Sequence, residues 1–123
     1  MNKILIVDDE EKVRKLVEIT LSIGKVEILQ ASSGEEGLKI ARETRPDIIL
    51  LDVMMPGRFD GFDVCKLLKE DPVTRDIYII MLTAKGQKAD KEKGLAPGAD
   101  DYFVKPFSRM ELMEKIEKIL AEK

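Results

Sequence analysis

The sequence predicts an α/β fold built on a parallel β-sheet, and two patterns carry this prediction. Short apolar runs of strand length alternate five times with stretches of helical periodicity, and no domain-sized linker interrupts them. The run at residues 48–51 is apolar throughout, which is typical of a strand covered on both faces. Because crossovers between parallel strands are right-handed, a doubly wound sheet is the simplest topology. The length of the chain predicts one domain over residues 1–123.

The expected strands are short and rich in aliphatic side chains. They occupy residues 3–7, 27–31, 47–51, 77–82 and 102–104. The second of them ends in Ala31 and two serines rather than in acids. This ending favours an outer position for that strand, away from any site formed by acidic residues.

Five helices are expected between and after the strands, and three of them show an apolar stripe at helical spacing. The stripes comprise Val13, Leu16, Val17, Thr20 and Leu21 in the first helix, Val64, Leu67 and Leu68 with Cys65 beside them in the third, and Leu112, Ile116, Ile119 and Leu120 in the last. Each stripe predicts the face that packs on the sheet.

Helix starts are indicated by capping boxes, in which a serine and a glutamate three residues later bond each other's backbone N–H groups. The second helix begins with Ser33 and Glu36, and the last begins with Ser108 and Glu111. The fourth expected helix, at residues 87–94, has almost no apolar face and therefore has the weakest pattern of the five.

Composition excludes several classes of protein. The 123 residues include no histidine and one cysteine, so Ser–His and Cys–His catalysis, most zinc sites and an internal disulfide are excluded. A net charge of -3 argues against direct nucleic-acid binding through the bulk surface. No apolar run approaches the ~20 residues that span a bilayer, and residues 4–7 are too few for a signal-peptide core. We therefore expect a cytoplasmic domain.

Polar residues follow the expected strands at the edge where function collects in such sheets. Asp8 and Asp9 follow the first strand, Asp52 the third, Thr83 the fourth and Lys105 the fifth. Each has an ordinary alternative role: the aspartates of the first strand and the threonine could cap helices, Asp52 could be a loop acid, and the lysine could lie on the surface. Their occurrence together is less easily explained by separate coincidences.

Electrostatics favours a divalent cation among these acids. Two unit charges ~4 Å apart repel by about 4 kcal/mol at an effective dielectric constant near 20. With only Lys105 as counter-charge, either some of the three carboxylates are protonated or a cation lies between them. Oxygen ligands without histidine or cysteine favour Mg²⁺, or Mn²⁺, over zinc. A cation, an amine and a hydroxyl are also what phosphoryl transfer needs.

Four segments, in matching order and spacing, give a specific family resemblance. They are ILIVDDE at residues 4–10, DIILLDVMMP at 47–56, LTA at 82–84 and GADDYFVKPF at 98–107. Over essentially its whole length, the chain resembles the receiver domain of two-component response regulators. The resemblance implies a flavodoxin-like five-stranded sheet in the order 2-1-3-4-5, with five helices on its two faces.

The resemblance also implies a phosphoacceptor and a metal site. Asp52 would accept the phosphoryl group. Mg²⁺ would be bound directly by Asp9, Asp52 and the backbone carbonyl of Met54, while Asp8 would act largely through water. The donor would be a phosphohistidine of a separate histidine kinase or phosphotransfer protein, which agrees with the absence of histidine from this chain. The domain would catalyse only its own phosphorylation and dephosphorylation, and it would not act as a multiple-turnover enzyme.

Further roles implied by the resemblance concern the phosphoryl oxygens and the response to phosphorylation. Lys105 would pair with one phosphoryl oxygen and Thr83 would hydrogen-bond another. Tyr102 would be the switch aromatic that turns inward when Thr83 moves. The Lys105–Pro106 peptide bond would be cis. Lys85 would tune hydrolysis of the acyl phosphate together with the residue at position 54.

Two features concern interactions with other molecules. Lys91, Asp101, Glu111 and Lys115 fall where the winged-helix branch of the family forms salt bridges across an activated dimer, so we expect a monomer or a weak homodimer enhanced by phosphorylation. Solvated helix charges explain the same residues equally well. In the loop after the third strand, residues 57–59 contain one residue more than the family pattern, which alters the loop where a kinase would make contact.

Other functions fit the sequence less well. A phosphohydrolase would ordinarily carry an acid two residues after its nucleophile, where Met54 stands. A flavin carrier on the same fold would meet repulsion between its phosphate and the acids at residues 8–11. A degenerate receiver would lack part of the set at the strand ends, which is complete here. A receiver belonging to a DNA-binding regulator of the winged-helix type stays open as an alternative.

Overall fold

The computed structural model of the chain describes residues 2–22, 25–84, 98–105 and 107–122. Strands and helices alternate along most of this length. The strands are β1 (Asn2–Val7), β2 (Val26–Ala31), β3 (Ile48–Asp52), β4 (Tyr78–Ala84) and β5 (Asp101–Lys105). The helices are α1 (Glu11–Leu21), α2 (Gly34–Thr44), α3 (Gly61–Glu70) and α5 (Arg109–Ala121).

All neighbouring strands pair in parallel in one sheet, whose order is β2-β1-β3-β4-β5. This confirms the doubly wound topology and the expected strand order, with β2 at an edge. The described residues contain four helices rather than the five expected. The fifth, expected at residues 87–94, lies outside the part of the chain that the structure describes.

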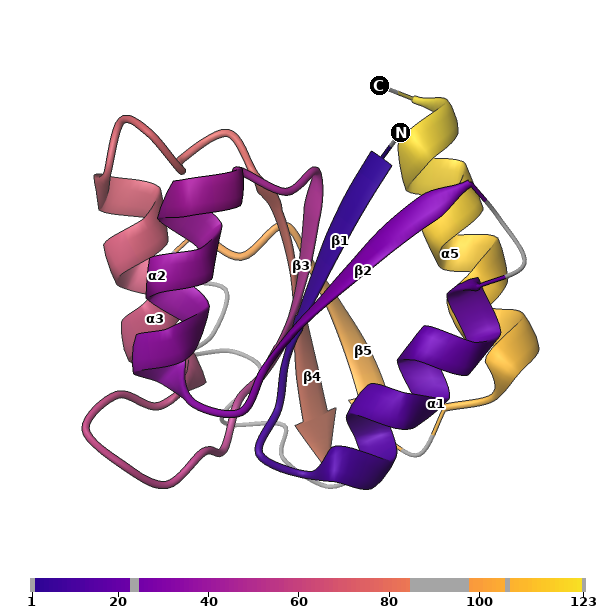
Figure 1. The fold of residues 1–123 in the computed structure, drawn as a ribbon, viewed down its shortest axis with the longest axis horizontal. Coiled ribbons are helices and arrows are strands. Elements are labelled where there is room, and N and C mark those ends of the chain that lie inside the picture. The colour runs from indigo at the N-terminus through magenta and orange to yellow at the C-terminus, as the bar shows by residue number, and fades with distance from the viewer. Residues whose placement is uncertain (1, 23–24, 85–97, 106, 123) are drawn as a thin grey trace.

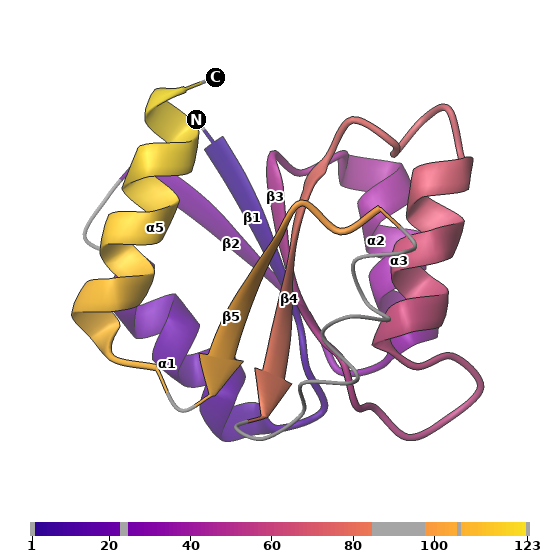
Figure 2. The same cartoon turned by 180° about the vertical axis from the view of Figure 1, so that it is seen from behind.

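The described residues form three layers, with the sheet between two pairs of helices (Figures 1 and 2). Helices α2 and α3 cover one face, and α1 and α5 cover the other. One core cluster, which includes Leu5, Ile49 and Val64, lies beneath α2 and α3. The second, which includes Ile4, Leu50 and Leu112, lies beneath α1 and α5. Successive residues of β1 and β3 face opposite clusters, which explains why these strands are apolar throughout.

Strands β3, β4 and β5 each extend beyond the apolar run that predicted them. Asp52 is the last residue of β3, Thr83 is the penultimate residue of β4, and Lys105 is the last residue of β5. The expectation that these residues follow their strands was therefore wrong by one or two positions. Asp52 pairs with Leu82, and the last residues of β4 and β5 pair with each other. Backbone pairing does not require an apolar side chain, so the strands continue past their apolar runs.

The helix starts largely follow the predicted caps. Ser108 and Glu111 form the complete capping box of α5. At α2, the Ser33 hydroxyl accepts a hydrogen bond from the Glu36 backbone N–H at 3.2 Å, but the Glu36 carboxylate accepts from Ser32 N–H at 2.6 Å rather than from Ser33. The expected capping box is therefore only half formed, because the Glu36 side chain extends past the N-cap and bonds the residue before it.

The buried face of α3 differs from the predicted stripe by one residue. Val64, Cys65 and Leu68 are fully or almost fully buried, whereas Leu67 is 37% exposed. The helix uses the spacing i, i+1, i+4 from Val64, which places Cys65 toward the sheet and turns Leu67 outward. Among the described residues, no helix is both long and apolar enough to cross a lipid bilayer.

Candidate functional site

Three carboxylates meet at the carboxyl edge of the sheet. Oxygen atoms of Asp8, Asp9 and Asp52 lie within 4.8 Å of one another. Asp8 is fully buried and Asp52 is 6% exposed, while Asp9 faces solvent. The sequence analysis expected these acids at one edge because they follow strands of one parallel sheet, and the structure brings them together. Such a set of oxygen ligands is suitable for a hard divalent cation.

Lys105 provides the positive charge next to two of these acids. Its Nζ donates hydrogen bonds to Asp8 Oδ2 at 2.8 Å and to Asp52 Oδ1 at 3.2 Å. Its side chain is 18% exposed, and Glu10 lies 4.0 Å away. Burial lowers the pKa of Lys105, but the hydrogen bond to Asp8 and the charges of Asp52 and Asp8 outweigh it, so the net shift is upward. The lysine therefore stays protonated at neutral pH.

Asp52 remains poorly neutralised in spite of this lysine. Burial, followed by the charge of Asp8, raises its pKa to about 7, against the opposing effect of Lys105. A weak hydrogen bond from the Met54 backbone N–H reaches Asp52 Oδ1 at 3.4 Å. One ammonium thus does not compensate for the desolvation and crowding of these carboxylates, and a second cation would find a favourable potential here.

Three other residues expected to act here lie on or just after strands β3, β4 and β5. Thr83 is 3% exposed and follows Leu82, the residue paired with Asp52. Met54 has an exposed side chain, 60% accessible, two residues beyond Asp52. Tyr102 packs against the core cluster under α2 and α3, and burial followed by the charge of Cys65 raises its pKa to about 12. Lys85, Lys91 and Pro106, to which the sequence analysis gave roles, lie outside the described residues.

Comparison with known proteins assigns the family. The sequence matches the response regulator receiver domain over residues 4–117. The chain belongs to this family. It is 48% identical over 118 residues to "Probable transcriptional regulator ycf27" of Guillardia theta, with 96% of the chain and 45% of that protein covered. It is 44% identical over 117 residues to the phosphate regulon transcriptional regulatory protein PhoB of Pseudomonas aeruginosa, covering 95% of the chain and 51% of PhoB.

A solved structure gives the same result at the level of the fold. The crystal structure of a response regulator from Chloroflexus aurantiacus J-10-fl superposes with a TM-score of 0.90 at 39% identity, and the alignment covers 98% of each chain. The receiver domain spans about half the length of the curated relatives given above.

The loop between β3 and α3 of this receiver domain contains the extra residue. Phe59 is partly buried against the core under α2 and α3, and its ring lies 5.2 Å from the Arg58 guanidinium carbon. A Cβ atom on Gly34 would lie 2.8 Å from the Phe59 carbonyl oxygen and 2.8 Å from a Val64 methyl carbon. The longer loop therefore packs against the start of α2, where only glycine leaves sufficient room.

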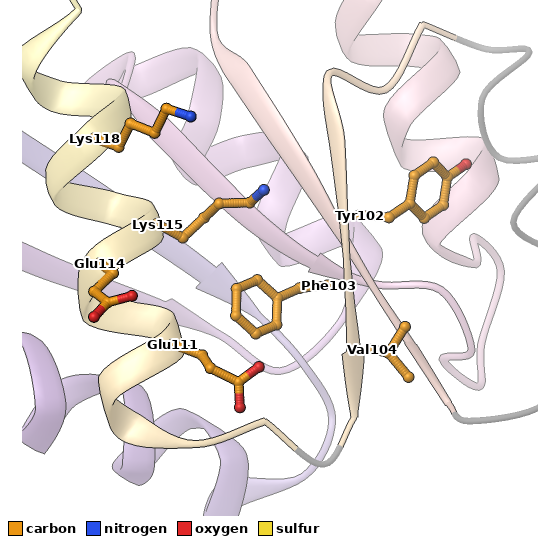
Figure 3. A pocket seen from close by; sticks show the side chains of 7 residues that line it. All are labelled: Tyr102, Phe103, Val104, Glu111, Glu114, Lys115 and Lys118. Carbon is orange, nitrogen blue, oxygen red and sulfur yellow. The ribbon is translucent and has the colours of Figure 1, made fainter.

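A surface hollow lies between β5 and α5 (Figure 3). Lys115 points from α5 toward β5, and its Nζ pairs with Asp101 of the same chain at 2.6 Å. Glu111 serves in the capping box of α5. Phe103 points toward α5, whereas Tyr102 points to the opposite side of β5. The described residues expected to form intermolecular salt bridges thus have intramolecular partners in the single receiver domain.

The sequence analysis missed one residue that contacts the backbone of the site. Arg14 donates from Nη1 to the Asp8 carbonyl oxygen at 2.7 Å. It lies in the first expected helix next to Val13, where a polar residue is ordinarily exposed to solvent. No signal in the sequence distinguishes it from the other basic residues of this helix, Lys12 and Lys15.

Proposed function

We propose that this receiver domain accepts a phosphoryl group on Asp52 from a phosphohistidine of a separate histidine kinase or phosphotransfer protein, and that it acts in the cytosol. The observation that supports this most directly is the convergence of Asp8, Asp9 and Asp52 within 4.8 Å, next to a lysine bonded to two of them. Phosphoryl transfer depends mainly on positioning and charge neutralisation, which this arrangement would supply together with a bound cation.

The residues present fit a Mg²⁺ ion. Asp8, Asp9 and Asp52 offer carboxylate oxygens, and the backbone carbonyl of Met54 is the further ligand that we assign, with Asp8 acting largely through water. The raised pKa of Asp52, caused by its burial and then by Asp8, indicates a negative potential that a second cation would relieve. Bound Mg²⁺, or Mn²⁺, would neutralise the charge that gathers on the phosphoryl oxygens.

The chain's own residues then have distinct tasks. A carboxylate oxygen of Asp52 attacks phosphorus in line, an O–P bond forms, and the N–P bond breaks with its electron pair passing to the leaving imidazole. Lys105 holds Asp52 and Asp8 in place before transfer and pairs with a phosphoryl oxygen afterwards. Thr83 moves toward the phosphoryl group and donates a hydrogen bond from its hydroxyl to another phosphoryl oxygen, and Tyr102 turns inward after it as the switch residue.

Transfer and autodephosphorylation are the only reactions proposed for this domain. An aspartyl-phosphate phosphohydrolase would ordinarily use a second acid two residues after the nucleophile, but Met54 occupies that position. Phosphate release beyond one equivalent from a simple phosphate ester would contradict this view.

A role in gene regulation is the second part of the proposal. Relatives that the chain matches over about half their length are named as transcriptional regulators. We infer that this receiver controls a DNA-binding regulator and does not itself contact DNA. Phosphorylation would favour weak self-association through β5 and α5, after the bond between Lys115 and Asp101 is exchanged for one across the dimer. Sedimentation with and without a phosphoryl mimic measures this association.

The central experiment is intact mass spectrometry after incubation with Mg²⁺ and acetyl phosphate. The wild-type chain should gain one phosphoryl group, and Asp52→Asn should gain none. Asp76→Asn is the matched control, because Asp76 is an exposed acid near the opposite edge of the sheet. Chelation of the metal with EDTA should abolish labelling. Equal labelling of wild type and Asp52→Asn would refute the assignment of the phosphoacceptor.

A further inference from the structure

Three hydrogen bonds connect helix α1 and the edge strand β2 to the turn that carries the acids. The Arg14 guanidinium donates from Nη1 to the Asp8 carbonyl at 2.7 Å and from Nε to the Gln30 side-chain oxygen at 3.3 Å. The Gln30 amide donates in turn to Glu18 Oε2 at 2.5 Å. Arg14 is half-buried, and it is oriented by groups that lie outside the acidic cluster.

The turn at residues 8–10 is also held by Lys105, whose Nζ donates to Asp8 Oδ2 at 2.8 Å, and by the Glu10 carbonyl, which accepts from the Val13 and Arg14 backbone N–H groups. Glu10, the N-cap of α1, makes no side-chain capping hydrogen bond. The Asp8 carboxylate accepts from the Glu10 backbone N–H at 2.9 Å, and the Asp8 backbone N–H donates to the Ala31 carbonyl at 3.1 Å. The arginine bonds the carbonyl of Asp8 and so restrains the peptide unit that joins Asp8 to Asp9. The directions of both carboxylates depend on this unit.

We propose that Arg14 is a positioning residue for the divalent cation, because its guanidinium holds the Asp8–Asp9 turn in the orientation in which both acids face Asp52. The inference rests on the function proposed above. Partners behind metal ligands fix the ligand geometry, and their removal typically lowers metal affinity about 10- to 100-fold. Arg14 acts on the backbone, so we expect the lower end of that range.

The charge of Arg14 would have the opposite effect on the cation. A positive charge close to the acids repels Mg²⁺, so loss of this charge alone would tighten binding. Positioning and simple charge therefore predict opposite signs for the same substitution. This difference makes the proposal testable by a binding constant, without any measurement of phosphorylation.

The experiment is isothermal titration of the apo chain with Mg²⁺. Arg14→Ala should weaken binding about tenfold. Arg14→Lys keeps the charge but offers one ammonium in place of the guanidinium fork, so it should recover only part of the affinity. Gln30→Ala keeps the charge of Arg14 and removes the group that orients it, and it should weaken binding about threefold. Lys15→Ala is the matched control, since Lys15 is an exposed cation on the same helix and should leave the dissociation constant unchanged.

Urea unfolding of the same apo proteins separates positioning from a merely structural role. If Arg14→Ala lowers stability while its Mg²⁺ dissociation constant stays at the wild-type value, or if it binds more tightly, the proposal is overturned. If Arg14→Ala does not fold, Arg14→Lys and Gln30→Ala decide, and wild-type affinity in both overturns it. If the wild-type chain itself binds no Mg²⁺, the proposed function fails as well, whereas equal binding by wild type and variants refutes only the role of Arg14.

Discussion

The sheet has one edge where its parallel strands begin and one where they end, and the charged residues at these two edges differ in how well they are paired. At the edge where the strands begin, Lys69 donates from Nζ to the carbonyl oxygens of Arg75 and Ile77 at 3.1 and 2.8 Å and to Asp100 Oδ2 at 3.0 Å. Asp100 also accepts from the Ile79 backbone N–H at 2.8 Å. At the edge where the strands end, Lys105 bonds only two of three clustered carboxylates, and the pKa of Asp52 is raised to about 7 by burial and then by the charge of Asp8.

The difference separates an edge whose charges are paired and stabilise the fold from the edge that carries the proposed site. Around Lys69, a charged donor meets as many acceptors as it has protons, so its removal leaves polar groups unpaired. Around Asp52, negative charges outnumber the positive ones, so removal of one acid relieves repulsion. Substitutions at the two edges should therefore change the free energy of unfolding with opposite signs.

The largest effect is expected at the first of these edges. Lys69→Ala should lower the free energy of unfolding by about 3 kcal/mol, because it leaves Asp100 and two carbonyl groups without their charged donor. Urea unfolding measures the loss. Lys66→Ala, on the exposed side of the same helix, should change stability by less than about 0.5 kcal/mol. A loss below about 1 kcal/mol at Lys69 would remove the contrast between the edges.

At the opposite edge, Asp52→Asn should stabilise the apo chain, and the gain should depend on pH. The pKa of Asp52 rises from its ordinary value of 3.8 to about 7 in the folded chain, so the folded state binds more protons between these values. Wild-type stability from this group is therefore present below about pH 4 and is lost as pH rises through 7. The gain of Asp52→Asn should be near zero at about pH 4 and should grow by up to about 1.4 kcal/mol per pH unit until it levels off above about pH 7. A gain that is constant with pH would contradict the assignment.

Magnesium should reduce the difference between the edges. At a free concentration ten times its dissociation constant, Mg²⁺ should stabilise the wild-type chain by about 1.4 kcal/mol, since it binds the folded state. The ion should also lower the pKa of Asp52 and so weaken the pH dependence described above. Asp9→Asn should abolish most of this stabilisation. Thermal unfolding with and without the ion provides the measurement, and identical curves for the wild type would contradict the metal site.

The smallest effect concerns ordinary helix caps at the functional edge. Ser108→Ala should destabilise the chain by about 1 kcal/mol, because it removes the serine half of a complete capping box. Ser33→Ala should cost somewhat less, since Glu36 retains its bond to Ser32 N–H. Chemical denaturation of both variants would show that polar residues at this edge can still stabilise the fold. Stabilisation by either substitution would refute this distinction.

The sequence predicted the layered fold well because its signals are local or periodic. Apolar runs located the five strands, and their continuity indicated coverage on both faces. Helix stripes were less reliable, since Leu67 and Cys65 lie on opposite flanks of the stripe and the sheet decides which of them is buried. The strand ends were placed too early because Asp52 and Lys105 take part in backbone pairing although they are polar.

The site was predictable to the extent that topology alone brings its residues together. Asp8, Asp9, Asp52 and Lys105 lie at the ends of strands of one parallel sheet, so their proximity follows from strand order. The role of Arg14 could not be read in advance, because its bond to the Asp8 carbonyl depends on how α1 packs against β2. Nor could the raised pKa of Asp52 be given a value, since it depends on the burial of the carboxylate.

The close approach at Gly61 has a consequence for how movement could spread from the site. A Cβ atom on this residue would lie 2.1 Å from the Asp52 carbonyl oxygen, and the Gly61 N–H donates to the Val53 carbonyl at 3.0 Å. Helix α3 therefore begins directly against the main chain of Asp52, with no side chain between them. A displacement of the Asp52 main chain would press on the first turn of α3, so this contact offers a short path from residue 52 to the helix.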